Sequence, residues 1–554
     1  MFPAHLAQFL PLANPLGMGP GDLIVLALAA LLLIVALAWH PWWKPYAVRL
    51  APHTGWCMLL VAVLPVALRL LLLPLHPAPV PDIYDEFSHL LVADTLRHGR
   101  LANPVHPLHE FFETFFVLEE PTYSSIYPVG QGALLAFGWV VFGSPWAGVI
   151  LSVAALCALC YWMLRAWTTP GWALAGGLLA VMEFGPLNQW MNSYWGGALP
   201  AAAGCLVFGA LPRLRRRGRL RDAVLLGAGL AIHLLSRPYE SVFLLLCVLL
   251  YLLPAWRVAA KPLSIAALVA LPAAGLTLLQ DKQVTGSWTT LPYALSQYQY
   301  GVPAVLTFQA NPVPHHELTR EQDLDYKMQL SFRGDRTETV GSYLLRMAYR
   351  IRYYRFFFMP PLYLALPFFF LALRDRQLVW VIVFPVMFAL GVNFFPAFQY
   401  HYMAGVVCFF VLAGLIGLQQ LSRFSALAAR IIFVLCIAQF VFEYGLHLAS
   451  SDPWSLALRN PARRVAVNHQ LAQATGRQLV FVRYWPWHIF QDEWVYNAAD
   501  IDRARVVWAR DLGPAEDEKL RRYYPDRTVW LLEPDARPPR LTAYSAVDYR
   551  PVTR

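Results

Sequence analysis

The sequence predicts a mainly α, polytopic helical membrane protein with about 12 transmembrane helices and a small C-terminal α/β domain. Hydrophobic residues make up 58% of the 554-residue chain and charged residues only 14%, and the mean hydropathy is +0.45. The apolar residues form blocks of roughly 17–25, the length that crosses a bilayer as a helix. A soluble core would need amphipathic helices to cover such blocks, and few are visible. The composition therefore excludes an ordinary soluble protein.

Individual spans follow from these apolar blocks. The block 223–236 is short for a span, and the segment 129–143 is too short to cross upright, so it predicts a juxtamembrane or re-entrant helix. The expected spans lie near 22–40, 55–75, 146–166, 172–188, 197–213, 223–236, 240–256, 263–280, 356–373, 377–394, 402–420 and 431–448.

Basic residues set the expected orientation. Lys and Arg concentrate in alternate short loops, above all in RLRRRGRLR at 213–221, whereas the opposite loops hold acids and long insertions. Because cytoplasmic loops are rich in Lys and Arg, both termini, the loops 76–145 and 281–345 and the tail are expected on the non-cytoplasmic side. The net charge of +10 belongs to this pattern, so membrane lipids are expected as partners and nucleic acid is not.

The tail differs from the rest of the chain, so residues 1–450 are expected to form the transmembrane domain and 451–554 a separate extracytoplasmic α/β domain. Charge density rises there, and three β-type runs appear at 478–482, 504–509 and 527–532, separated by polar, helix-compatible stretches. Strand and helix alternating at this spacing indicate a small α/β domain.

An acidic pair in PDIYDEFSHLL, just beyond the apolar run 55–75, is the first candidate for chemistry. On a helix that begins after Pro81, the side chains of Asp82, Asp85 and His89 share one face. A carboxylate held at the membrane surface among apolar residues has a raised pKa and suits a general base. The alternative is a capping acid on a solvated helix face.

A second group follows in NPVHPLHEFFETFF, where Pro107 suits a first helical turn. The shared polar face would carry His106, His109, Glu110 and Glu113, while Phe111, Phe112, Phe115 and Phe116 would cover another side. This pattern predicts an amphipathic helix in the membrane interface, aromatic side down. Imidazole and carboxylate at i, i+4 can bind a divalent metal ion, and the alternative is a wetted face without metal.

The stretches YDEFSHLLVADTLRHG and YPVGQGALLAFGWVVFG resemble the opening of bacterial GT-C membrane glycosyltransferases, of the dolichyl-phosphate-mannose-protein mannosyltransferase and aminoarabinose-transferase types. The resemblance implies a GT-C-like fold in the bacterial inner membrane, a polyprenyl-phosphate sugar donor, and inverting transfer on the outer side to a lipid, glycan or protein acceptor. Asp85 matches the position of the family's catalytic base, and Glu86 stands at the adjacent acidic position.

One departure from the family concerns the next outer loop, where many relatives carry a second Asp. Here the loop reads NQWMNSYWGGALP and has no carboxylate. Tyr194 can still hydrogen-bond a sugar, and Trp195 can stack on one.

The departing lipid phosphate of such a transfer must be met by cations or hydrogen-bond donors. Arg237 is a candidate because an arginine at membrane level needs a partner. Arg346 and Arg350 suit bidentate phosphate binding, with snorkelling to lipid headgroups as the alternative. His401 lies at another outer helix end and is a candidate for the phosphate or for interfacial packing.

Three other functions stay open at this stage. A multi-span transporter fits the number of spans, although no internal repeat is evident. A lipid-linked oligosaccharide ligase or polymerase would use similar donors. A non-catalytic membrane subunit would use the tail to bind cell-wall glycan.

Overall fold

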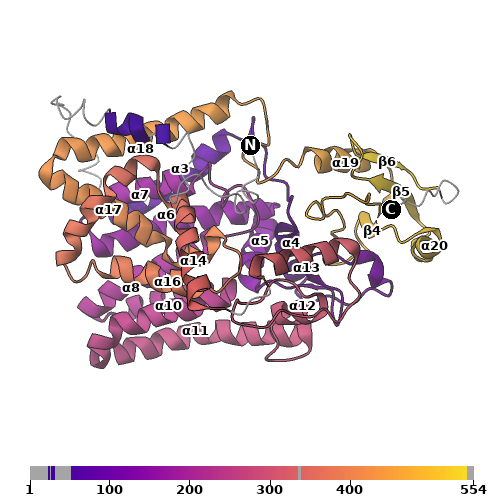
Figure 1. Ribbon diagram of the computed structural model, residues 1–554, viewed down its shortest axis with the longest axis horizontal. Helices are drawn as coiled ribbons and strands as arrows, with labels where there is room; N and C mark the ends of the chain where they lie inside the picture. The colour runs from indigo at the N-terminus through magenta and orange to yellow at the C-terminus, as the bar shows by residue number, and fades with distance from the viewer. Residues whose placement is uncertain (1–22, 25, 32–51, 335–337, 546–554) are drawn as a thin grey trace.

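The computed structural model describes residues 23–24, 26–31, 52–334 and 338–545, and most of the first expected span, 22–40, lies outside them. A bundle of long helices forms one end of the molecule and a small sheet with two helices forms the other (Figure 1). The helices α12 (Pro292–Tyr300) and α13 (Arg320–Arg333) lie between these two parts. The outer loops therefore connect the membrane bundle to the tail.

Six helices of the described part are long and apolar enough to cross a membrane. Only 22%, 17% and 28% of the apolar windows on α3, α11 and α18 are buried inside the protein, as expected for lipid contact, whereas the window on η7 and α17 is 83% buried at the centre of the bundle. Helices lie at the expected spans 55–75, 146–166, 172–188, 197–213, 223–236, 240–256, 263–280, 377–394, 402–420 and 431–448. The bundle helices are α3 (Thr54–Leu71), α5 (Val129–Phe142), α6 (Pro145–Trp167), α7 (Pro170–Phe184), α8 (Ala198–Arg217), α9 (Leu220–Ser236), α10 (Pro238–Leu252), α11 (Trp256–Thr285), α16 (Trp380–Val392), the 3-10 helix η7 (Tyr400–Val406) with α17 (Val407–Phe424), and α18 (Ala426–Ala449).

The expected span 356–373 is not one continuous helix. The chain there forms short turns: η4 (Ile351–Phe357), η5 (Pro360–Leu364), α15 (Leu366–Phe369) and η6 (Phe370–Arg374). Pro360, Pro361 and Pro367 each lack the backbone N–H that a regular helix needs. The apolar pattern indicated one membrane-spanning helix here, but the prolines break it into short turns.

The segment expected as a juxtamembrane or re-entrant helix is α5, which packs against α4 (Tyr84–Arg97). Gly132 allows this close approach, because a Cβ atom there would lie 2.2 Å from Val92 Cγ1 on α4. The helix that carries the acidic pair is therefore fixed against the bundle.

The tail forms α19 (Ala462–Gln473), α20 (Pro514–Tyr523) and a four-stranded sheet in the order β4-β3-β5-β6. The strand β3 (Arg477–Val482) is parallel to both β4 (Val506–Arg510) and β5 (Arg527–Glu533), and β6 (Arg540–Ala543) is antiparallel to β5. The three predicted strand runs are confirmed as β3, β4 and β5.

The amphipathic helix expected after Pro107 is wrong, because only the short 3-10 helix η2 (His109–Phe112) forms there. Its phenylalanines do not face lipid. Phe111 and Phe112 are buried in one cluster with Phe481, Val507 and Leu520 of the tail. The aromatic side chains that predicted a membrane interface instead make a protein interface with the C-terminal sheet.

Candidate active site

The acidic pair opens α4, and its two carboxylates point to different places. Glu86 caps the helix: its carboxylate accepts hydrogen bonds from the backbone N–H groups of Asp82 (2.9 Å) and Ile83 (3.3 Å). It also accepts one from the N–H of Tyr194 at 2.8 Å. Burial is the main cause that raises the pKa of Glu86 to about 7. Glu86 is not among the residues that line the neighbouring cavity, so its predicted catalytic role is not supported by its position.

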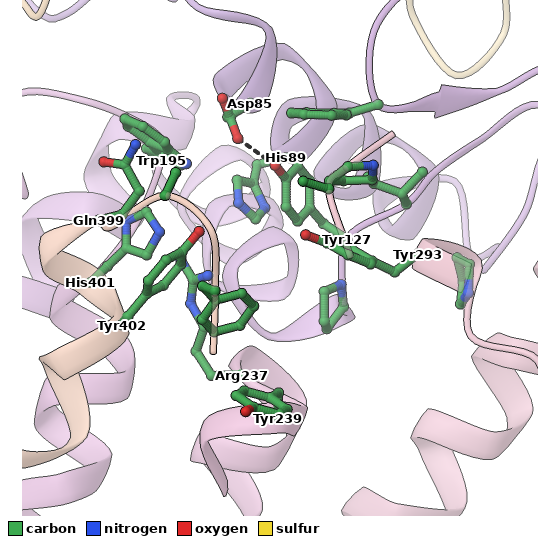
Figure 2. A pocket seen from close by; sticks show the side chains of 18 of the residues that line it. Asp85, His89, Tyr127, Trp195, Arg237, Tyr239, Tyr293, Gln399, His401 and Tyr402 are labelled. Carbon is green, nitrogen blue, oxygen red and sulfur yellow. Dashed lines mark hydrogen bonds between the residues drawn. The ribbon is translucent and has the colours of Figure 1, made fainter. Parts of the chain in front are cut away.

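Asp85 lines a cavity of about 320 Å³. The wall is built from the first turn of α4, the residues before α5 and α10, the outer end of α11, the outer loops and two residues of the tail. Figure 2 shows Asp85, His89, Tyr127, Arg237 and Tyr402 around this space. The cavity therefore lies where the membrane bundle, the outer loops and the tail meet.

The Asp85 carboxylate is 7% exposed and accepts a short hydrogen bond from the Tyr127 hydroxyl. Burial raises the pKa of Asp85 to about 6, while the hydrogen bond from Tyr127 and the positive charge of Arg237 oppose that rise. A carboxylate of this pKa is largely ionised at neutral pH and remains basic enough to accept a proton.

Arg237 supplies positive charge to the same cavity. It lies at the break between α9 and α10, where its backbone carbonyl accepts hydrogen bonds from the N–H and the hydroxyl of Ser241. Its guanidinium lies over the Tyr402 ring, 5.9 Å from the centroid. Among the ion pairs of the described residues none includes Arg237, so its charge is available to an anion in the cavity.

His401 and Trp195 also line the cavity, as expected for substrate-binding residues. Their ring centroids lie 5.1 Å apart in an edge-to-face arrangement. Tyr194 does not face the cavity, because its hydroxyl donates to the Pro79 carbonyl at 2.9 Å. The outer loop 186–197 thus contributes an aromatic wall through Trp195 and a brace for α4 through Tyr194.

Arg346 and Arg350 do not line the cavity, which differs from the expectation that they bind phosphate. Arg346 pairs with Glu338 at 2.5 Å. Arg350 donates to backbone carbonyls of the 392–397 loop, among them Val392 at 2.8 Å and Phe395. Residues 395–397 form part of the cavity wall, so these arginines support the wall from the side that faces away from the cavity.

The four residues predicted to bind a metal point to different partners. His106 contacts Tyr524 (3.1 Å) and Asp502 in the tail region, and His109 lies 3.7 Å from Glu120. Glu113 meets His316 and Gln322 of the 281–345 loop, each at 3.1 Å, and Glu110 is exposed. Within the described ranges no three His, Cys, Asp or Glu side chains converge as metal ligands. The helix that would have aligned these four side chains does not form, so they do not fit a metal site.

Several cavity residues were not expected from the sequence. Tyr127 lies in YPVGQG, a stretch that carried the family resemblance without being expected to line a site. Tyr293 comes from α12, and Arg459 and Gln491 come from the tail, where Arg459 donates to the Gln491 carbonyl at 3.1 Å. No local pattern links Tyr127 to Asp85, which lies 42 residues earlier in the chain, and the tail carries no pattern that places its residues beside α4.

The fold has counterparts among solved structures. No protein-family model and no curated protein matches the sequence. The apo crystal structure of ArnT from Cupriavidus metallidurans matches with a TM-score of 0.51 and 13% identity over 87% of this chain and 93% of that chain. The same protein bound to undecaprenyl phosphate has the same identity and coverage with a TM-score of 0.48. An Archaeoglobus fulgidus oligosaccharyltransferase in complex with Zn and sulfate is 11% identical over 86% of this chain and 67% of that chain, with a TM-score of 0.48.

The likeness to apo ArnT, which is of the aminoarabinose-transferase type, confirms the predicted GT-C-like fold. The chain is accordingly an integral membrane protein with the fold of ArnT.

Proposed function

We propose that this chain is an inverting membrane glycosyltransferase that moves a sugar from a polyprenyl-phosphate donor to an acceptor on the outer side of a bacterial inner membrane. The observation that carries the proposal is that one cavity holds both a buried basic carboxylate, Asp85, and an arginine, Arg237, that has no ion-pair partner among the described residues. ArnT, whose fold the chain shares, also has a structure with undecaprenyl phosphate, which supports a lipid phosphate as donor.

In the proposed reaction Asp85 accepts the proton of an acceptor hydroxyl or amine as that atom bonds to the anomeric carbon. The bond from this carbon to the phosphate oxygen breaks on the opposite side, which inverts the configuration. Tyr127 holds the carboxylate in place through its hydrogen bond. Arg237 meets the negative charge that develops on the departing lipid phosphate. No metal ion is needed for this description, and none of its steps uses one.

The test measures transfer of a labelled sugar from a panel of polyprenyl-phosphate glycosides in proteoliposomes. Asp85→Asn keeps the shape of the side chain but removes the base, and losing a general base lowers the rate about 10²–10⁴-fold. Asp323→Asn is a matched control, because Asp323 is a partly exposed acid of α13 whose ion pair, among the described residues, is with Lys327.

Equal transfer by wild type and Asp85→Asn would remove Asp85 from its role. Absence of transfer by the wild type with every donor, combined with uptake of a free solute into the liposomes, would favour a transporter instead.

A further inference from the structure

His89 is a buried, polar part of this cavity wall to which the proposed reaction gives no task. It lies one helical turn after Asp85 on α4, lines the cavity and is 4% exposed. Neither of its ring nitrogens has a hydrogen-bond partner among the described residues. A buried polar group without a partner costs about 1–3 kcal/mol, so its presence calls for an explanation outside the folding of the chain.

Packing fixes the direction of the imidazole. Its ring stacks on Tyr127, with centroids 4.2 Å apart and planes 23° from parallel, and the same Tyr127 donates to Asp85. In Figure 2 the imidazole lies between Asp85 and Arg237. Arg237 also acts electrostatically on both groups, which places all three around one space.

The protonation state of His89 restricts which ligand it suits. Burial, and then the charge of Arg237, lower the pKa of His89 to about 3, so the ring is neutral at physiological pH. A neutral imidazole has one N–H donor and one acceptor nitrogen, whichever tautomer is present. An ionised phosphate only accepts hydrogen bonds and would leave the acceptor nitrogen unpaired. A hydroxyl group both donates and accepts, so vicinal sugar hydroxyls can satisfy both nitrogens.

We infer that His89 binds hydroxyl groups of the transferred sugar and so helps to select the donor by its sugar and not by its lipid phosphate. The inference rests on the proposed function. The base at one end and the arginine at the other leave the sugar between them, which is the place that His89 faces.

The experiment compares binding of two probes to purified full-length protein by native mass spectrometry: undecaprenyl phosphate without sugar, and undecaprenyl phosphates carrying glucose, galactose or arabinose. His89→Leu removes both hydrogen-bonding nitrogens at similar size. We expect His89→Leu to lower the affinity for the preferred glycoside about 10- to 100-fold, because lost hydrogen bonds of buried groups have an effect of this size. Binding of the sugar-free lipid should stay unchanged. His89→Asn, whose amide donates and accepts, should recover part of the loss.

Two controls separate this role from a structural one. His98→Leu alters a histidine of the same α4 region that does not line the cavity, and should change neither probe. His89→Leu should melt no lower than the wild type without ligand, because the imidazole has no hydrogen-bond partner among the described residues to lose and leucine is large enough to pack against the Tyr127 ring.

Equal weakening of both probes by His89→Leu would assign the imidazole to the phosphate and overturn the inference. Unchanged binding of both probes would overturn it as well, leaving His89 as a packing residue. Failure of the wild type to bind any of these lipids would overturn the proposed function itself, and this inference with it.

Discussion

The hydrogen bond from Tyr127 to Asp85 gives a prediction about pH. The base acts only when ionised, so we expect activity to rise with pH along an acidic limb centred at about 6, the pKa of Asp85. Tyr127→Phe removes a donor that stabilises the ionised carboxylate. A hydrogen bond to a charged group contributes about 1.5–3 kcal/mol, and one pKa unit corresponds to about 1.4 kcal/mol. The limb should therefore move up by about one to two pH units.

The assay is transfer of labelled sugar at saturating donor between pH 5 and 9. At pH 7 the Tyr127→Phe protein should be about 2- to 10-fold slower than the wild type, and it should recover at high pH, because a limb near 7–8 leaves much of the base protonated at neutrality. Recovery separates a raised pKa from misfolding, which alkaline buffer would not repair.

Tyr293→Phe is the matched control, because Tyr293 lines the same cavity without a hydrogen bond to Asp85. Its acidic limb should stay near that of the wild type. If the limb of Tyr127→Phe stays near 6 or moves lower, the hydrogen bond does not hold the pKa of Asp85 down and the reasoning is refuted.

Three further predictions concern stability. Burial raises the pKa of Asp85 from 3.8 to about 6. Its ionised form therefore destabilises the fold above pH 6 by at most about 3 kcal/mol. Asp85→Asn should melt at a higher temperature than the wild type at pH 7.5, and the difference should be smaller at pH 5. Glu86→Ala removes the cap of α4 and the tie to Tyr194. It should lower the free energy of unfolding by about 1–3 kcal/mol in chemical denaturation at about pH 4, where Glu86 is largely neutral and its buried charge no longer opposes folding. Arg510→Met leaves Glu321 of α13 buried and without its ion pair, at a cost of about 3–5 kcal/mol. Limited proteolysis should therefore cut the 281–345 loop faster than in the wild type. An unchanged cleavage rate would show that the Arg510–Glu321 pair does not hold the loop in place.

The helices of the membrane bundle could be predicted from the sequence because backbone polar groups in lipid have to be hydrogen-bonded within the chain. Apolar blocks of sufficient length become helices, and the described helices lie where most blocks were expected. The exception at 356–373 shows the limit of hydropathy, which does not register that Pro360, Pro361 and Pro367 interrupt backbone hydrogen bonding.

The prediction for 106–116 failed for a different reason. The periodicity of a sequence indicates that apolar side chains such as phenylalanines are shielded from water, but it does not indicate whether lipid or protein covers them. Phe111 and Phe112 are covered by the sheet of the tail, about 370 residues later in the chain, and long-range contacts of this kind leave no local pattern. Without a regular helix, His106 and Glu113 diverge, and the expected metal ligands separate.

Within the site, the sequence identified Asp85, Arg237, Trp195 and His401, because each stands out against its surroundings as a charged or aromatic group at a membrane boundary. It did not distinguish Asp85 from Glu86. Only the backbone geometry at the start of α4 determines which carboxylate caps the helix and which one faces the cavity.

The position of the tail has a consequence for how the protein matures. The tail packs directly on α4, where Tyr496 stacks on Phe87 and Asp94 accepts a hydrogen bond from the N–H of Ala499, and Arg459 and Gln491 complete the cavity wall. These tail residues are synthesised well after α4. A growing chain thus contains Asp85 long before it contains Arg459 and Gln491, and the cavity wall is complete only after the tail has packed back onto α4.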